Sequence, residues 1–192
     1  MKNWFKNGAL AFGMVLALAA CGSETESETQ TAVDADDRSG DPLSEVIGDD
    51  ASLAMVTSAF EQTGLVGVIE GKADYTVFAP TDTAFQALGD DASALLEGES
   101  RGPILAAILR EHMVPGALTP EAIREAIASS GDEVSMSSFG AGTLVFSVDG
   151  DDLVVTNDTG QQARLGTEAV IASNGVVIPI DSVLVDPAAL EQ

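Results

Sequence analysis

The sequence predicts an α+β domain, mainly because of how its apolar residues are spaced. In the first half of the region after residue 42 these residues recur at every third or fourth position, as on one face of a helix. From Val134 onward they recur at every second position, as in strands. Helices first and strands after them indicate an α+β arrangement and not a parallel α/β sheet. A hydrophobic content of 45% is too high for a disordered chain, and a single cysteine allows neither an intrachain disulfide nor a multi-cysteine metal site.

Residues 1–20 are predicted to be a lipoprotein signal peptide. Lys2 and Lys6 form a positive start, and residues 8–20 carry no charged side chain. This apolar run is shorter than the roughly 20 residues with which a helix crosses a bilayer, and it is typical of a secretory signal. It ends in the letters LAAC, which resemble the bacterial lipobox. The resemblance implies cleavage before Cys21 and lipidation of that residue, and two or more acyl chains hold a protein stably on a membrane.

Residues 21–42 are predicted to be a lipid-anchored acidic tether. The stretch is rich in Asp and Glu, contains few aliphatic residues and has Arg38 as its only base. Such a segment buries too little apolar surface to fold, and its like charges favour an extended chain. A calcium-binding loop is the alternative, but the spacing of the aspartates lacks the Gly and the final Glu of an EF-hand. Gly22 stands where an Asp tends to retain bacterial lipoproteins in the inner membrane, so the sequence favours the outer membrane or the cell surface.

The folded domain is predicted to occupy residues 43–187, followed by a short tail at 188–192, and its first half is expected to be helical. Each helix is marked by a capping residue, by Pro in its first turn or by a Gly stop. The predicted helices contain Leu53, Val56 and Phe60 before the stop at Gly64, Ala84, Phe85 and Leu88 after the cap at Thr81, Ile104 to Leu109 after Gly102 and Pro103, and Ile123 and Ile127 after Thr119, Pro120 and Glu121.

A buried strand is predicted at residues 75–79, where a β-prone run ends at Pro80. Two dipeptides, Asp149-Gly150 and Asn174-Gly175, are signals for tight turns between strands. Pro179 has no N–H group, so it is expected at a sheet edge or a bulge. The remaining strands are predicted at residues 134–136, 144–148, 153–155, 170–172, 176–178 and 183–185.

Three blocks of the sequence resemble the signature blocks of the fasciclin domain family. They are YTVFAPTDTAFQAL at residues 75–88, LREHMVPGAL at 109–118 around His112, and NGVVIPIDSVLV at 174–185. The resemblance implies one domain, a β-sandwich or wedge with several helices packed beside it, in an extracytoplasmic protein associated with adhesion. Where the family often has Tyr before the central His, this chain has Glu111. Because that Tyr-His pair belongs to the surface implicated in integrin recognition, integrin binding is not carried over.

Thr81, Asp82 and His112 are the candidate residues for binding a ligand or partner. His112 is the only histidine, and its charge can change near neutral pH. Its position on a mostly apolar helical face favours a hydrogen-bonded, structural role instead, and Asp82 equally suits support of a helix N-terminus. A single histidine cannot supply the several ligands of a His-based metal site.

No catalytic residue and no cofactor is predicted, and the protein is not expected to be an enzyme. The chain lacks the G-x-S-x-G pattern of a nucleophile elbow. The carboxylate pairs Asp90-Asp91 and Asp151-Asp152 lie in turn-like contexts, whereas a raised carboxylate pKa requires burial.

The sequence therefore predicts an envelope-anchored adhesion or interaction module that contacts other cells, matrix or polysaccharide. The alternative is an envelope binding protein for a small apolar or sugar ligand. The formal net charge of −23 excludes nonspecific binding to nucleic acid. It also disfavours anionic lipid headgroups, so contact with the membrane is expected only through the lipid on Cys21. Because such a charge makes copies repel one another, attachment is expected to depend on salt or divalent cations.

Overall fold

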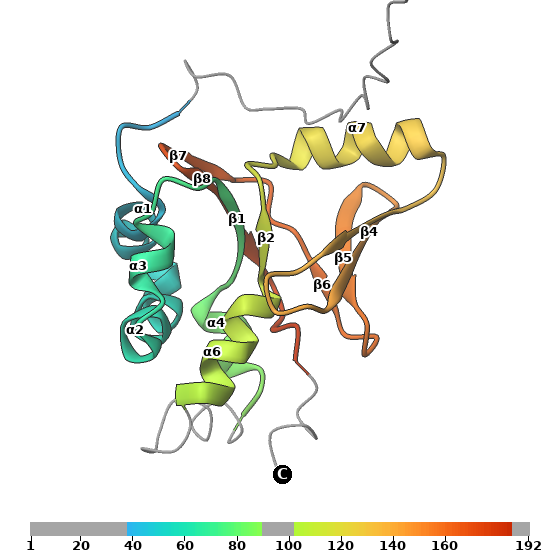
Figure 1. Cartoon of the computed structure of the whole chain (residues 1–192). Coiled ribbons are helices and arrows are strands. Elements are labelled where there is room, and N and C mark those ends of the chain that lie inside the picture. Colours follow the sequence, from blue (N-terminus) through green and yellow to red (C-terminus); the bar gives the residue numbers. More distant parts are fainter. Residues whose placement is uncertain (1–37, 90–101, 186–192) are drawn as a thin grey trace, which may run out of the picture.

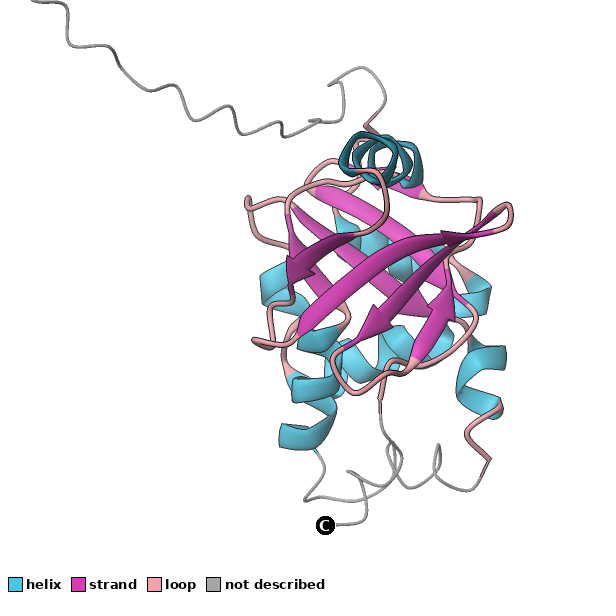
Figure 2. Cartoon of the chain, turned by 90° about the vertical axis from the view of Figure 1, so that its right-hand side faces the viewer, coloured by secondary structure: helices cyan, strands magenta, loops and turns pink. Residues whose placement is uncertain are grey.

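Two four-stranded sheets face each other, and a group of helices covers the outer side of the first sheet (Figure 1). The computed structural model describes residues 38–89 and 102–185. The predicted signal peptide, the lipidation site Cys21, most of the tether, Asp90-Asp91 and the C-terminal tail lie outside the described residues. Figure 2 looks onto the second sheet, with most of the helices behind the strands.

The predicted helices form, and their caps take the expected geometry. The Thr81 and Thr119 side chains accept hydrogen bonds from the N–H groups of Ala84 and Ala122, and Gly64 ends its helix with a φ of 68°. These are the positions at which a helix leaves backbone groups without partners. The described helices are α1 (Leu43–Asp49), the 3₁₀ turn η2 (Ala51–Leu53), α2 (Ala54–Thr63), α3 (Val66–Ile69), α4 (Asp82–Gln86), α6 (Gly102–Glu111) and α7 (Pro120–Ser130).

The strands divide between a first sheet of order β2-β1-β8-β7 and a second sheet of order β3-β4-β5-β6. In the first sheet β1 and β8 pair in parallel, whereas the other pairs of both sheets are antiparallel. The strands are β1 (Tyr75–Pro80), β2 (Met113–Pro115), β3 (Val134–Ser137), β4 (Thr143–Asp149), β5 (Asp152–Asn157), β6 (Gln162–Arg164), β7 (Val170–Ala172) and β8 (Gly175–Ile180).

One strand that we predicted from the sequence is absent from the structure, and two short strands were not predicted. Residues 183–185 are a buried loop and not a strand, because the Leu184 N–H donates to the His112 side chain and the Val185 N–H to the Val183 carbonyl. The missed strands β2 and β6 have three residues each, too few for an alternating pattern to show.

Each inner strand of the first sheet contributes to two hydrophobic cores. On β1, Val77 and Ala79 face the core shared with the helices, and Phe78 faces the core shared with the second sheet and α7. This alternation follows from the two-residue period of a strand. Both faces of β1 are covered, which fits its nearly continuous apolar sequence and confirms the buried strand that the sequence predicted.

Other parts of the chain cover the two edges of the first sheet. At β7, the Ser39 N–H donates to the Ile171 carbonyl and the Ser173 N–H to the Asp41 carbonyl. At β2, the Phe139 N–H donates to the Met113 carbonyl. Covered edges do not offer free backbone groups to another chain. The end of the predicted tether, from residue 38, thus packs against the domain.

Pro179 occupies a position of β8 that lies beyond the end of β7. The last pair between the two strands joins Val170 to Val177, so β7 leaves that side of Pro179 open. There the Pro179 carbonyl accepts a hydrogen bond from the Gly166 N–H at 2.7 Å. The missing N–H group of proline therefore costs the ladder nothing at this point, as expected of a local sheet edge.

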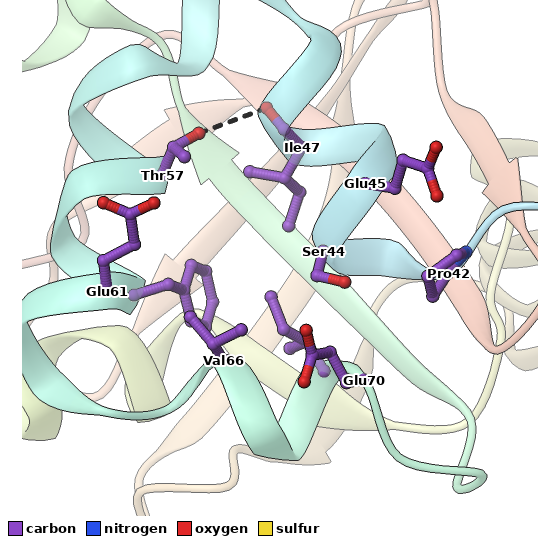
Figure 3. A pocket seen from close by; sticks show the side chains of 10 residues that line it. Pro42, Ser44, Glu45, Ile47, Thr57, Glu61, Val66 and Glu70 are labelled. Carbon is purple, nitrogen blue, oxygen red and sulfur yellow. Dashed lines mark hydrogen bonds between the residues drawn. The ribbon is translucent and has the colours of Figure 1, made fainter.

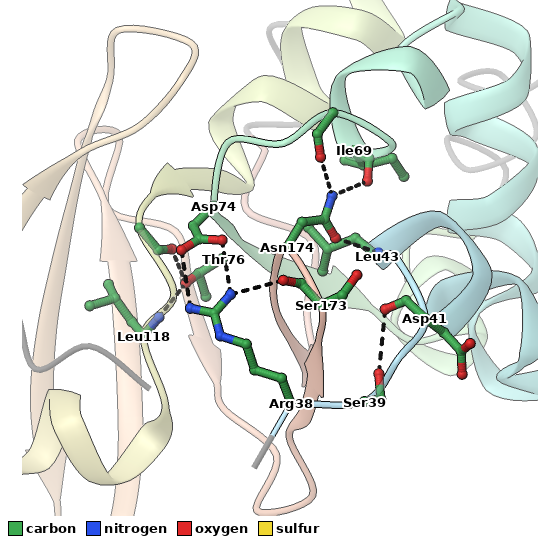
Figure 4. Close-up of polar contacts among 12 residues, drawn as sticks. Arg38, Ser39, Asp41, Leu43, Ile69, Asp74, Thr76, Leu118, Ser173 and Asn174 are labelled. Carbon is green, nitrogen blue, oxygen red and sulfur yellow. Dashed lines mark hydrogen bonds and ion pairs between the residues drawn. The ribbon is translucent and has the colours of Figure 1, made fainter. Parts of the chain in front are cut away.

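Asn174 (Figure 4) and the following Gly175, the first residue of β8, form the corner at which α1, α3 and the first sheet meet. The Asn174 side chain accepts from the Leu43 N–H and donates to the carbonyls of Ile69 and Gly71, each at 2.8 Å. Gly175 has a φ of 153°, and a Cβ there would collide with the Tyr75 carbonyl oxygen and lie 2.8 Å from a methyl group of Leu43. The corner therefore requires glycine.

Replacing Gly175 by Ala is expected to lower the free energy of unfolding by about 3 kcal/mol or more, because backbone must move to admit the methyl group. Gly48→Ala is the matched control, since its Cβ would meet no atom within 4 Å in α1. That change should leave stability unchanged or raise it by up to about 1 kcal/mol. Urea unfolding monitored by circular dichroism measures both values, and equal effects would contradict the assignment of the corner.

Candidate functional site

His112 is enclosed between α6 and β2 and is only 2% exposed. Its Nε2 accepts a hydrogen bond from the Leu184 N–H at 2.9 Å, so the ring proton lies on Nδ1, which donates to the Ile108 carbonyl at 2.8 Å. Burial lowers the pKa of His112 to about 4, against the opposing effect of the Ile108 carbonyl. Both ring nitrogens are thus used inside the protein, in agreement with the structural role that the sequence favoured.

Asp82 supports a helix N-terminus, but not that of its own helix. Its Oδ1 accepts a hydrogen bond at 2.9 Å from the N–H of Met55, which lies in the first turn of α2. An acceptor with a negative charge at this position satisfies a free donor and interacts well with the helix dipole. Asp82 therefore ties the start of α4 to the start of α2, two segments that lie 27 residues apart in the chain.

Thr81 combines its capping role with a place in an open cleft, which we call the Thr81 cleft. Two cavities of about 600 and 230 Å³ share Thr81, Gly166 and Pro179. The larger one is also lined by hydroxyl and carboxylate side chains, and the smaller one by Arg164 and Asp181. The hydroxyl and carboxylate residues of the larger cavity are Asp50, Ser52, Thr167 and Glu168. His112 lines neither cavity, so the structure does not bring the three predicted residues into one site.

A second open site, which we call the helical groove, lies between α1, α2 and α3 (Figure 3). Its volume is about 380 Å³. Four apolar side chains form its floor. The rim carries one exposed glutamate from α1, one from α2 and one that directly follows α3. The floor residues are Ile47, Phe60, Val66 and Ile69, and the rim residues are Glu45, Glu61 and Glu70.

Sequence reasoning missed the helical groove because the three glutamates belong to separate short helices. Glu45 lies in α1, Glu61 in α2, and Glu70 directly follows α3. Only the packing of those helices brings the side chains to one opening, so no local spacing marks them.

Glu111, which stands where the family often has Tyr, binds its own chain. Its carboxylate accepts a hydrogen bond from the Ser138 hydroxyl at 2.5 Å. The loop that follows lies so close that a Cβ on Gly140 or Gly142 would collide with the carboxylate. Glycine at both positions therefore lets the loop between β3 and β4 pack on Glu111, and the same loop carries the exposed Phe139 against Tyr75.

In residues 38–89 and 102–185, no three His, Cys, Asp or Glu side chains lie close enough together to hold a metal ion. Among the same residues, no helix has the length and apolar character needed to cross a membrane.

Two facing sheets with a helical layer define an α+β sandwich, and its candidate binding features are clefts open to the surroundings. The model of the fasciclin domain matches residues 51–186. The chain belongs to the fasciclin domain family, as the three sequence blocks predicted.

The relatives include proteins of both bacteria and animals. Protein sll1483 of Synechocystis is 30% identical over 178 residues, which are 92% of this chain and 91% of that protein. The cell surface glycolipoprotein MPB83 of Mycobacterium bovis is 31% identical over 153 residues, or 77% of this chain and 62% of that protein. The transforming growth factor-beta-induced protein ig-h3 of Sus scrofa is 33% identical over 150 residues, and these cover 75% of this chain but 19% of the pig protein.

A solved structure supports the fold. The FAS1 domain pair of the insect cell adhesion molecule fasciclin I superimposes with a TM-score of 0.67 at 14% identity, covering 78% of this chain and 52% of the pair. The predicted sandwich or wedge with helices beside it is thereby confirmed.

The buried His112 predicts a loss of stability in mild acid. Its pKa in the folded state lies below the unfolded value of about 6.5, so the unfolded chain takes up a proton that the folded chain excludes. Its stabilising contribution is complete above pH 6.5 and is lost as the pH falls toward 4. Between these values the free energy of unfolding should fall by roughly 3 kcal/mol more in the native protein than in His112→Gln. Urea unfolding across this range measures the difference, and parallel pH profiles would show that His112 is not buried as a neutral group.

Removal of the Asp82 carboxylate is expected to weaken the start of α2. Asp82→Ala should lower the free energy of unfolding by about 1 kcal/mol, the usual cost of a lost cap. Asp82→Asn should retain most of that energy, because its amide oxygen can still accept from the Met55 N–H. If the two variants are equally unstable in thermal or urea unfolding, the hydrogen bond is not the source of the effect.

Proposed function

We propose that this protein is a lipid-anchored interaction module of the bacterial cell envelope, which mediates contact with other cells, matrix or polysaccharide. The observation that carries the proposal is the use of His112 and Asp82 inside the fold. These two groups, which the sequence marked as candidates for binding a ligand or partner, hold helices and loops together. The open clefts are left as the features that can meet a partner, and this favours an interaction module over an enzyme.

The position of the tether supports an anchored module. Arg38 forms a bidentate ion pair with Asp74, at 3.0 and 3.1 Å, and donates to the Ser173 carbonyl (Figure 4). This contact fixes the point at which the tether leaves the domain. From there, residues 22–37 would span at most about 55 Å when fully extended. A lipid on Cys21 would thus hold the domain near the membrane while leaving its faces accessible.

The names of relatives are consistent with this proposal. The mycobacterial relative is a cell surface glycolipoprotein, and the insect protein with the same fold is a cell adhesion molecule. For this chain, a surface location and a role in adhesion are part of the proposal.

The Thr81 cleft favours a second candidate function, the binding of a sugar-like ligand in the envelope. Its hydroxyl and carboxylate groups are the kind that hydrogen-bond a carbohydrate, and its volume lies in the range of small-molecule sites. A bound small molecule in native mass spectra of the purified protein would support this function.

The primary proposal predicts that lipidation is needed for attachment. In a strain that lacks the gene, surface attachment should be restored by the native protein but not by Cys21→Ser, which removes the acylated thiol. Attachment should also increase with millimolar calcium, which screens or bridges the acidic surfaces. The measurement is the count of attached cells, with immunoblots to show equal protein levels.

An unchanged count after deletion, or full restoration by Cys21→Ser, would contradict an anchored adhesin. The binding of a small ligand would then be the function to pursue.

A further inference from the structure

We infer that the helical groove binds a cationic segment of a partner protein in which Lys or Arg side chains flank an apolar side chain. This inference deepens the proposed function, because it assigns a contact site and a class of partner to the interaction module. It rests on the shape of the groove, on its charge and on the charge of the rest of the chain.

The floor of the groove provides an apolar contact. Ile47, Phe60 and Ile69 belong to the core beside the first sheet, and Val66 is partly buried against them. The Thr57 hydroxyl at the wall already donates to the carbonyls of Ile47 and Leu53 (Figure 3). Its proton is therefore not available to a ligand. Because Ile47, Phe60 and Ile69 are only 1–2% exposed, an apolar side chain of a partner that entered this cavity would be buried mainly against Val66.

The rim provides negative charge at three separate points. Glu45, Glu61 and Glu70 are exposed, and no Lys, Arg or His lines the groove. In the described part of the chain, no three acidic side chains converge as a metal-binding set. The three carboxylates therefore suit an extended molecule that carries several positive charges better than a single ion. Lysines or arginines spaced along a peptide meet this requirement.

Once the predicted signal peptide, which carries Lys2 and Lys6, has been cleaved, the chain itself offers no suitable occupant. Residues 22–37 and 186–192 contain acidic residues but no Lys or Arg, and residues 90–101 contain four acidic residues beside Arg101. A second copy is also a poor match, because the net charge is −23 and two of the arginines, Arg38 and Arg164, already pair with aspartates. Charge complementarity thus indicates a different, basic protein.

The test uses the purified full chain with Cys21→Ser and a synthetic peptide in which three lysines alternate with two leucines, capped at both ends. Isothermal titration at low salt should show binding that weakens at physiological ionic strength. The triple variant Glu45→Gln, Glu61→Gln and Glu70→Gln should raise Kd about tenfold, as expected when three exposed ion pairs are lost.

A matched control separates a specific groove from general charge attraction. Glu121→Gln, Glu125→Gln and Glu133→Gln change the net charge by the same amount on and after α7, which lies on the other side of the first sheet (Figure 1). This control should bind the peptide like the native protein. Val66→Ser, which keeps every charge, should weaken binding, and so should replacement of the leucines of the peptide by serine.

Three results would overturn the inference: no binding by the native protein, an equal loss in the two triple variants, or unchanged binding by Val66→Ser when its unfolding curve shows a folded protein. The attachment assay fails or succeeds independently of this test. If attachment requires the anchored protein but the groove variant attaches normally, adhesion uses another face and only the groove assignment is wrong.

Discussion

The parallel pairing of β1 with β8 is the constraint on which the rest of the structure depends. Six residues of each strand pair in register, although the strands lie a hundred positions apart in the sequence. Val77 and Val177 project into the core beside the helices, and Phe78 and Ile178 into the core beside the second sheet. Both cores are therefore assembled on the same two strands. The register begins at Gly175, where only glycine fits against the Tyr75 backbone, so the corner sets the position of both layers.

The same corner also holds the walls of the helical groove. One amide side chain, that of Asn174, binds the first N–H of α1 and two carbonyls at the end of α3. Because the groove lies between these helices and α2, its shape is determined before any partner arrives, and a preformed site loses less conformational entropy on binding. The Arg38–Asp74 ion pair lies beside this corner (Figure 4). A force on the tether would thus act first on this corner.

Much of the fold could be predicted from the sequence, because local signals determine it. Thr81, Thr119 and Gly64 mark helix ends through bonds made within a few residues, and the alternation of Leu144 and Phe146 marks a strand half covered by the core. Contacts between residues far apart in the chain could not be predicted from the sequence. Asp82 was recognised as a helix-supporting residue, but nothing local shows that the helix is α2. Residues 183–185 read as a strand because they are apolar, yet their backbone bonds a histidine ring and a near neighbour.

The acidic charge connects the parts of the proposed function. On the proposed tether, like charges favour an extended chain, which would hold the domain away from the membrane. Between whole chains it keeps copies apart, since the net charge of −23 acts over a Debye length of about 8 Å at physiological ionic strength. At the groove, three exposed carboxylates lie near an apolar floor, where a cationic partner would meet negative charge while burying its own apolar side chain. The same field raises the rate of encounter with basic proteins and lowers it with acidic ones. An acidic surface with an apolar opening would therefore select its partner by charge first and by shape second.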